Sequence, residues 1–153
     1  MTLIDTSKCV PAGEGVLGSV VPTREHVSDI EFGWGLLGQI VDMQIGDGMV
    51  VRERDVIAVE ATEGTVPMMR RAGELCRRKG WVLLKSAGKN DAGMPVVDVE
   101  TIRELAGAGG ICLAVSANGV LLADKAAVIA AADRHRIALV GIAEGIRDTG
   151  LRT

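Results

Sequence analysis

The chain has 153 residues, of which 48% are hydrophobic and only 2% are aromatic. A chain of this length can bury the core of one domain, and a core built from aliphatic side chains favours α/β layering over an aromatic-rich β-sandwich. The formal net charge of −3 provides no basic surface for nucleic acid, and no apolar run reaches the ~18 residues of a membrane span. We therefore expect a cytoplasmic protein that does not bind nucleic acid.

The chain begins with a segment that contains several glycines and prolines. Residues 1–22 keep neither helical nor strand periodicity and are predicted to form an N-terminal arm or loop. Thr23 then caps a predicted helix. Its apolar residues recur at 3-4-3-4 spacing and are Val27, Ile30, Trp34, Leu37 and Val41. Glycines at 33, 35 and 38 each cost about 0.5–1 kcal/mol relative to Ala, so we expect a neighbouring element of the same domain to pack closely there, with a second subunit as the alternative.

The rest of the chain alternates strands with helices. The predicted elements are a β-hairpin at 49–53 and 56–61, a helix capped by Thr65, a strand at 81–85, a helix from Asp98 or Glu100 to Leu105, a strand at 111–115 to which 120–122 returns, a helix capped by Asp124, and a strand at 137–140. This order predicts one layered α/β domain over residues 23–143, with a mixed or largely parallel sheet covered by helices, and a tail over residues 144–153.

Residues suited to chemistry gather where the second hairpin strand meets the next helix. Glu60 and Glu63 follow an apolar run, and Gly64-Thr65 opens the helix. Free N–H groups at a helix start suit an anion, whereas two neighbouring carboxylates suit a divalent cation. Together they would form a metal-assisted phosphate site. The alternative is a pair of exposed carboxylates at a strand end, and spacing alone favours that alternative.

Cationic side chains occur close to these carboxylates in the sequence. Arg70 and Arg71 could make charge-assisted contacts with phosphate, or they could simply form a solvated face. The segment after the strand at 81–85 also follows a strand end, which is where α/β sheets place their ligands. It offers Lys85, Lys89, Asn90 and Asp91. An ordinary solvated loop is equally compatible with this composition.

Several of these motifs occur together, in order and with similar spacing, in one known family. They are Glu14-Gly15-Val16-Leu17-Gly18, Asp29-Ile30, Val50-Val51, the block from Ala58 to Thr65, Arg70-Arg71-Ala72-Gly73, Val82-Leu83-Leu84-Lys85 and Ala132-Asp133-Arg134-His135. From about Glu14 to Ile142 the chain resembles the C-terminal domain of the LpxI-type UDP-2,3-diacylglucosamine pyrophosphatases. The Glu-Ala-x-Glu-Gly-Thr block is the most specific part of this resemblance.

The resemblance implies a bacterial, magnesium-dependent hydrolase of lipid A biosynthesis. Such an enzyme splits the pyrophosphate of UDP-2,3-diacylglucosamine into UMP and 2,3-diacylglucosamine 1-phosphate. The resemblance also implies a nucleotide-sugar lipid as substrate, a separate N-terminal domain as partner, and a site between the two domains. A homodimer, and a peripheral contact with the inner membrane through the lipid substrate, are left open.

The resemblance can be carried over residue by residue. Glu60, Glu63, Gly64 and Thr65 match the acidic block, Lys85 matches the lysine that ends the next strand, and Asn90-Asp91 stands where the family has Gln-Asp. Taken with the chemistry above, the predicted catalytic residues are Asp91 and Glu63, and the predicted metal ligands are Asp91, Glu60 and Glu63. The predicted substrate-binding residues are Gly64, Thr65, Arg70, Arg71, Lys85, Lys89 and Asn90.

The sequence departs from the family's Lys-Pro-x-Gln-Asp-x-Arg-x-Asp-x-Pro motif. Only Ala92-Gly93-Met94 separates Asp91 from Pro95, so the family's arginine and second aspartate have no counterpart, and Asp98 stands where a glycine is expected. The alternative function is therefore a non-catalytic domain that binds a phosphorylated ligand or dimerises. On the enzyme hypothesis, we expect the isolated chain to be weak or inactive because the N-terminal domain is missing.

Overall fold

The computed structural model describes residues 6–87 and 94–143, which form an α/β domain as predicted. The helices are the short 3-10 helix η1 (Thr6–Lys8) and the α-helices α1 (Arg24–Asp42), α2 (Thr65–Leu75), α3 (Val99–Ala108) and α4 (Lys125–Arg134). The strands are β1 (Cys9–Pro11), β2 (Gly15–Val16), β3 (Gly48–Arg52), β4 (Asp55–Glu60), β5 (Trp81–Lys85), β6 (Val96–Val97), β7 (Gly110–Ser116), β8 (Leu121–Ala123) and β9 (Ala138–Ile142).

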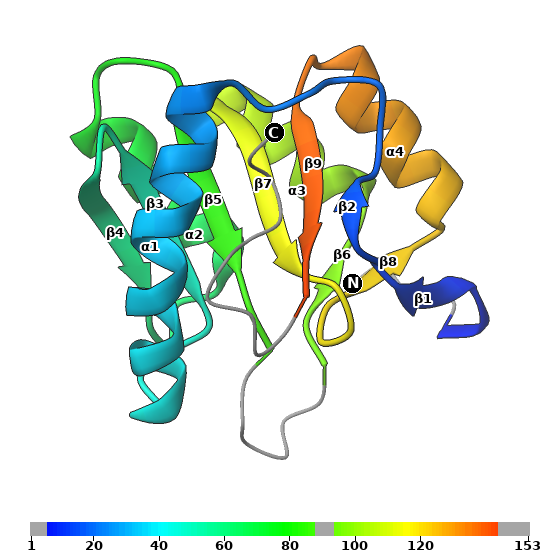
Figure 1. The fold of residues 1–153 in the computed structure, drawn as a ribbon, viewed down its shortest axis with the longest axis horizontal. Helices are drawn as coiled ribbons and strands as arrows, with labels where there is room; N and C mark the ends of the chain where they lie inside the picture. The colour runs from blue at the N-terminus through cyan, green and yellow to red at the C-terminus, as the bar shows by residue number, and fades with distance from the viewer. Residues whose placement is uncertain (1–5, 88–93, 144–153) are drawn as a thin grey trace.

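A six-stranded mixed sheet forms the centre of the fold (Figure 1). Its strand order is β2-β9-β7-β5-β3-β4. The strands β5, β7 and β9 run parallel, whereas β2, β3 and β4 pair antiparallel with their neighbours. Because α3 and α4 return the chain between the parallel strands, the carboxyl ends of β5, β7 and β9 all lie at one edge of the sheet. This carboxyl edge, at the bottom of Figure 1, is where side chains from strand ends can converge.

Helices cover both faces of this sheet. The helix α1 packs on one face, and α2, α3 and α4 pack on the other (Figure 1). Successive side chains of β5 point to opposite faces of the sheet, so this strand contributes to the hydrophobic core on each face. Trp81 and Leu83 belong to the cluster under α2 and α3, whereas Val82 and Leu84 belong to the cluster under α1. Every residue of β5 is buried, which is why this strand reads as a continuous apolar run.

Gly33 allows α1 to approach the sheet closely. A Cβ at this position would overlap the Leu84 side chain and would lie 2.9 Å from Val51 Cγ2, so only glycine fits without displacing these two side chains. The predicted close packing within the domain is therefore confirmed at Gly33. A Cβ at Gly35 or Gly38 would meet nothing within 4 Å, so packing among the described residues does not explain these two glycines.

One predicted hairpin is confirmed and the other is wrong. In the β3–β4 hairpin, Arg52 pairs with Asp55 across a two-residue turn. The predicted return of residues 120–122 across 111–115 does not occur, because β5 and β9 occupy both edges of β7. The strand β8 pairs instead with β1 and β6 in a separate three-stranded sheet.

The N-terminal segment contains more regular structure than the predicted arm or loop. The strand β1 joins the three-stranded sheet, and β2 pairs with β9 at one edge of the central sheet. Strands of three and two residues are too short to show periodicity, which is why the sequence pattern did not indicate them. The predicted tail at 144–153 lies outside the described residues.

Candidate functional site

The side chain of Lys85, at the end of β5, lies among four oxygen atoms. Its Nζ donates to Asp47 Oδ1 at 2.7 Å, to the two carboxylate oxygens of Glu60 at 2.9 and 3.0 Å, and to Thr65 Oγ1 at 2.8 Å. Lys85 and Glu60 are only 6% and 7% exposed. Buried charges of this kind persist only when each is paired, as both are here. We call Asp47, Glu60, Thr65 and Lys85 the Lys85 cluster.

Two glycines shape the turn that brings Asp47 to the cluster. Gly46 lies against the backbone carbonyl of Glu60, and a Cβ at Gly48 would lie 2.8 Å from Glu60 Oε1. The carbonyl of Asp47 accepts a hydrogen bond of 2.8 Å from the backbone N–H of Ser86. The turn before β3 is therefore held against the ends of both β4 and β5.

The start of α2 adjoins the Lys85 cluster. Thr65, the predicted N-cap, is instead the first residue of the helix, and the N-cap is Gly64, whose φ of 94° suits glycine. The Thr65 hydroxyl does not cap because it accepts from Lys85 and donates to Glu60 Oε1 at 2.7 Å. The N–H groups of Thr65 and Val66 have no acceptor within the helix. This helix start can therefore present backbone donors to an anion.

Glu63 and the two predicted arginines form ion pairs nearer the surface. Arg71 Nη2 lies 2.5 Å from Glu63 Oε1 and also donates to the carbonyl of Val59 at 3.1 Å. Arg70 pairs with Glu104 of α3 at 2.8 Å. The hydrogen bond to its carboxylate raises the pKa of each guanidinium, and the bond from Arg70 lowers the pKa of Glu104. Each arginine is therefore held by a carboxylate through its Nε and Nη2 groups.

The structure brings some of the predicted site residues together and adds one that the sequence did not indicate. The predicted residues that share hydrogen bonds in the Lys85 cluster are Glu60, Thr65 and Lys85. Asp47 was missed because Gly-Asp-Gly indicates only a turn, and its partner Lys85 lies 38 residues away in the sequence. The predicted site residues that lie outside the described part of the chain are Lys89, Asn90 and Asp91.

The described carboxylates, as arranged, do not fit a divalent cation. Both oxygens of Glu60 accept hydrogen bonds from Lys85, and both oxygens of Glu63 accept from Arg71. Within residues 6–87 and 94–143, no group of three or more His, Cys, Asp or Glu side chains could hold a metal ion. The predicted ligand Asp91 lies outside these ranges, so magnesium stays a prediction.

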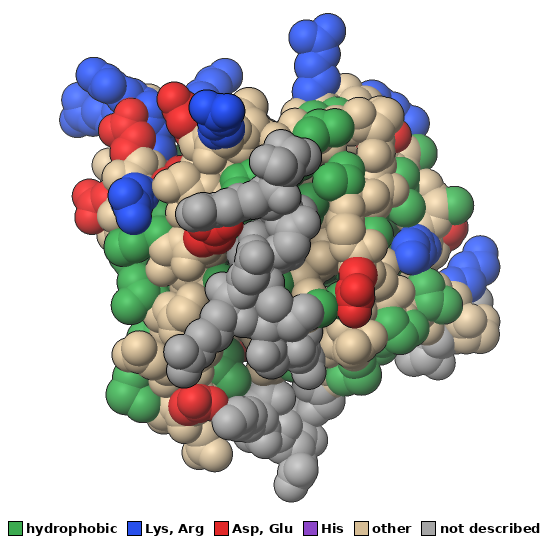
Figure 2. Space-filling model, viewed as in Figure 1, with side chains coloured by type: hydrophobic (Ala, Val, Ile, Leu, Met, Phe, Trp, Pro, Cys, Tyr) green, Lys and Arg blue, Asp and Glu red, His purple; other side chains and the backbone are tan. Residues whose placement is uncertain are grey.

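Figure 2 shows how charge is distributed over the face that carries α1. Lys and Arg side chains gather toward the top of this view, near the amino ends of the parallel strands, and none of those drawn lies along the lower edge. The N–H groups that open α2 are donors that a phosphate bound at the carboxyl edge could use.

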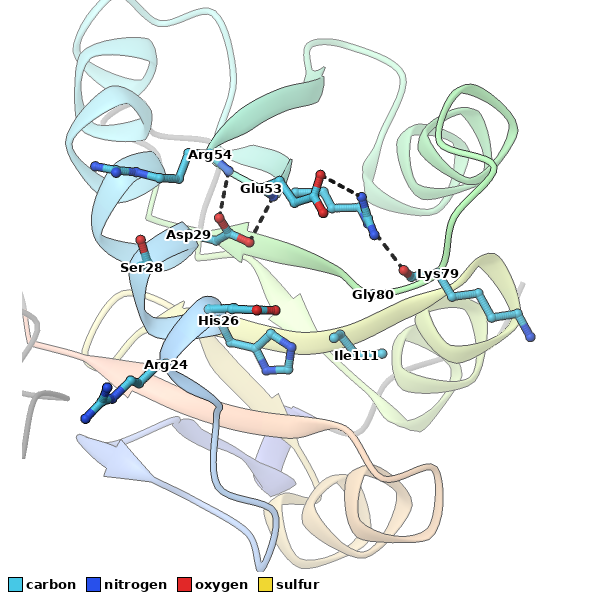
Figure 3. A pocket seen from close by; sticks show the side chains of 11 residues that line it. Arg24, His26, Ser28, Asp29, Glu53, Arg54, Lys79, Gly80 and Ile111 are labelled. Carbon is cyan, nitrogen blue, oxygen red and sulfur yellow. Dashed lines mark hydrogen bonds and ion pairs between the residues drawn. The ribbon is translucent and has the colours of Figure 1, made fainter.

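A pocket of about 500 Å³ lies at the opposite end of β5 from Lys85 (Figure 3). Its wall includes the first turns of α1, the β3–β4 turn and the residues just before β5. Figure 3 shows the side chains of Arg24, Arg54 and Lys79 extending away from the centre of this pocket, while Asp29 is bound to the turn beside it. Nine of its eleven lining residues are polar or charged, but none of them belongs to the Lys85 cluster or to the site residues predicted from the sequence.

Asp29 allows the β3–β4 hairpin to turn without glycine. Asp29 is 5% exposed, and its carboxylate accepts the backbone N–H groups of Glu53 at 3.2 Å and Arg54 at 2.8 Å. Both turn residues have positive φ, at 51° and 61°, as in a type I′ turn. This conformation is unfavourable for residues with a Cβ. The buried carboxylate offsets that cost by accepting both N–H groups of the turn.

Comparison with known proteins assigns the chain to a family. The family model for the LpxI C-terminal domain matches residues 13–140. The chain belongs to the LpxI family. It is similar to the UDP-2,3-diacylglucosamine pyrophosphatase LpxI of Caulobacter vibrioides, with 36% identity over 138 residues. The match covers 84% of this chain but 49% of that protein, so the chain spans about half the length of this LpxI relative.

The fold gives a structural role to other residues of the LpxI resemblance. Asp133 of α4 accepts the backbone N–H of Ser19 at 2.9 Å, and a Cβ at Gly18 would lie 2.5 Å from Asp133 Oδ1. The two residues thus dock the N-terminal segment on α4. Asp29 holds the hairpin turn in a comparable way. These parts of the LpxI pattern stabilise the domain, whereas the Glu60 block contributes to the carboxyl edge.

The length and apolarity of a helix determine whether it could cross a membrane. The helix α1, with 19 residues, is the longest of the described helices. In the part of the chain that the structure describes, no helix is both long and apolar enough to cross a membrane.

Proposed function

We propose that this chain is the C-terminal part of a hydrolase that cleaves the pyrophosphate of UDP-2,3-diacylglucosamine. The products would be UMP and 2,3-diacylglucosamine 1-phosphate, in a step of lipid A biosynthesis. The observation that carries this proposal is membership of the LpxI family over residues 13–140. The identity of 36% with an LpxI pyrophosphatase supports the same reaction.

The position of the Lys85 cluster also supports a phosphoryl-binding role. Open α/β sheets bind their ligands outside the carboxyl ends of the parallel strands, and Lys85 ends the parallel strand β5. The start of α2 is attached to this edge through Thr65. Its backbone N–H groups can hold phosphate oxygens, and the helix dipole favours the negative charge of a pyrophosphate.

The proposed chemical roles follow the sequence match to the family. Asp91 is the proposed catalytic carboxylate, and Lys89 and Asn90 are proposed to contact the substrate. Glu63 and Arg71, which form an ion pair, are proposed to belong to the same site. Magnesium would supply charge neutralisation of the pyrophosphate. Glu60 and Glu63 would have to leave Lys85 and Arg71 before either carboxylate could ligate it.

A second domain is part of this proposal. The chain spans about half of its Caulobacter relative, and we propose that an N-terminal domain completes the site. Contact with the inner membrane would then be peripheral and would occur through the acyl chains of the substrate.

The test is an assay of UMP release from UDP-2,3-diacylglucosamine. The enzyme is a chimera in which this chain replaces the matching half of the Caulobacter protein, and it is compared with this chain alone. We expect UMP release by the chimera in the presence of magnesium and little or none by the chain alone. In the chimera, Asp91→Ala should lower the rate by on the order of 100-fold or more, as removal of a catalytic acid or base does.

Glu100→Gln provides the matched control, because Glu100 forms only an exposed ion pair with Arg103 at 3.5 Å. This variant should keep the parent rate. An Asp91→Ala chimera with full activity would show that Asp91 is not the catalytic carboxylate. A folded chimera that releases no UMP, while the intact Caulobacter enzyme does, would contradict the hydrolase proposal.

A second candidate function is a non-catalytic domain that binds a phosphorylated ligand or dimerises. The short spacing between Asp91 and Pro95, which leaves no room for the family's arginine and second aspartate, favours this candidate. It predicts that UMP or inorganic pyrophosphate raises the melting temperature of the chain although the chimera has no activity. Dimerisation would be detected as a doubled mass in light scattering.

A further inference from the structure

We propose that Asp47 is a positioning residue of this site, which acts through Lys85 to hold the start of α2 in place. This inference rests on the proposed function, because it concerns how the same edge would hold a pyrophosphate. It also assigns Lys85 a different role from the one expected from the sequence. Lys85 orients the phosphoryl-binding groups and does not itself bind the phosphate.

The donors of Lys85 are fully used within the cluster. An ammonium group has three N–H bonds and no acceptor. Lys85 Nζ has Asp47 within 2.7 Å, Glu60 within 2.9 Å and Thr65 within 2.8 Å, which makes one partner for each bond. Its side chain is 7% exposed, so solvent does not compete for it. A phosphate oxygen could be bound by Lys85 only if one of these three partners were displaced.

Asp47 is the cluster member best placed to fix the ammonium. It is fastened at two points, because its carboxylate accepts from Lys85 and its backbone carbonyl accepts from Ser86. Its glycine neighbours lie against Glu60, which limits how far the turn can move. Asp47 is also the most exposed charged member, with 24% of its side chain accessible. Loss of the Asp47 charge would therefore loosen the Lys85 side chain without leaving a cavity in the core.

Thr65 transmits this arrangement to α2. Its hydroxyl accepts from Lys85 and donates to Glu60, so both bonds fix the orientation of the first helical residue. The N–H groups of Thr65 and Val66 belong to the same turn and follow that orientation. If Asp47 is removed, we expect the helix start to lose order and its backbone donors to bind an anion less well.

If Lys85 bound the phosphate directly, loss of the Asp47 charge would strengthen anion binding and not weaken it. In that case the Asp47 carboxylate would compete with the phosphate for the ammonium and would repel it electrostatically. Replacement of Asp47 by Asn would then strengthen anion binding. The sign of the change in affinity therefore distinguishes a positioning residue from a competing one.

The experiment titrates the chain with inorganic pyrophosphate and follows it by NMR. The parent, Asp47→Asn and the control Glu100→Gln are compared through the amide signals of Thr65 and Val66 and the ammonium signal of Lys85. We expect pyrophosphate to shift the two amides and to leave the Lys85 ammonium signal in place. Asp47→Asn should weaken the apparent affinity by on the order of tenfold, the effect of losing one charge-assisted hydrogen bond, whereas Glu100→Gln should not.

Spectra without pyrophosphate test the inference independently of the proposed function. Asp47→Asn should speed hydrogen exchange at the Lys85 ammonium and at the Thr65 amide, relative to Glu100→Gln. If the parent binds no pyrophosphate but these exchange rates change, the positioning role stands, and failure of the proposed function is recognised separately by the absence of UMP release from the chimera. Unchanged exchange rates, tighter pyrophosphate binding by Asp47→Asn, or a ligand-induced shift of the Lys85 signal would each overturn the inference.

Discussion

The backbone carbonyl of Glu60 lies directly against Gly46, so that a side chain at position 46 would occupy the space of the carbonyl oxygen. This contact sets the distance between the turn that carries Asp47 and the end of β4. It also explains why a glycine is required at a position whose φ is not positive, since the constraint comes from packing and not from backbone conformation.

We predict that Gly46→Ala destabilises the domain by about 3 kcal/mol, because a methyl group would have to displace backbone atoms of Glu60. Urea denaturation of the purified chain measures this change. The matched control is Gly35→Ala in α1, where a Cβ meets nothing within 4 Å. That substitution should instead stabilise the domain by about 0.5–1 kcal/mol through helix propensity. Equal effects of the two substitutions would contradict the packing argument.

The second prediction concerns Asp29 and the hairpin turn. Asp29→Ala should lower the free energy of unfolding by about 2 kcal/mol, because two backbone N–H groups lose a buried charged acceptor. Arg54→Gly should have the opposite effect and stabilise by about 1 kcal/mol, since glycine adopts positive φ without strain. Denaturant titration of both variants tests this pair. A stable Asp29→Ala protein would show that the turn does not need the carboxylate.

The third prediction is a loss of stability at mildly acidic pH that depends on His26. Burial lowers the pKa of His26 below 6.5, against the opposing influence of Asp29 and Glu25, and its Nδ1 accepts the backbone N–H of Thr23. Below pH 6.5 the unfolded chain therefore takes up a proton on His26 that the folded chain resists. Stability should be greatest above pH 6.5, decline as the pH falls toward the lower folded-state pKa, and level off below it.

Urea titrations between pH 5 and 8 measure this decline, and His26→Gln should reduce it. The matched control is His135→Gln, which removes an exposed imidazole at the C-cap of α4 and should leave the decline as it is in the parent. If His26→Gln left the decline in stability unchanged, groups other than His26 would be responsible for that decline.

The fourth prediction is that Cys112 does not react in the folded protein. Burial raises the pKa of its thiol to about 12, with a smaller contribution from the charge of Asp29. Little thiolate is therefore present at pH 8, and the sulfur is covered by the core under α1. Iodoacetamide followed by peptide mass spectrometry should modify Cys112 only after denaturation. Modification of Cys112 as fast as that of the partly exposed Cys9 and Cys76 would contradict the prediction.

Local patterns were sufficient to predict much of the fold. The strand at 81–85 was predicted with its observed bounds because Gly80 and a polar segment delimit an apolar run. Thr23 and Asp124 each cap a helix as predicted, and Asp98, one of the two predicted starts of its helix, is the N-cap of α3, since an N-cap acts on residues within the next turn. The pairing of β8 could not be predicted in this way because its partners β1 and β6 are distant or very short segments.

The candidate site was predictable only in part, for the same reason. Glu60 and Glu63 look alike in the sequence, yet Glu60 is buried against Lys85 whereas Glu63 is exposed beside Arg71. That difference depends on which face of the chain meets β5, and no local pattern encodes it. Likewise, Gly46-Asp47-Gly48 indicates a turn but not the lysine that the aspartate will meet. The resemblance to LpxI identified the region, and tertiary contacts then distinguished the role of each carboxylate.

The two carboxylates of the Lys85 cluster, Glu60 and Asp47, lie 25 and 38 residues from Lys85 in the sequence. This separation affects when the cluster can form during folding. Neither contact can be made until β3, β4 and β5 have paired, because those strands bring Asp47, Glu60 and Lys85 into reach. We therefore expect the cluster to assemble after the rate-limiting step. Contacts made that late slow unfolding more than they speed folding, so this buried ion network would chiefly lengthen the lifetime of the folded domain.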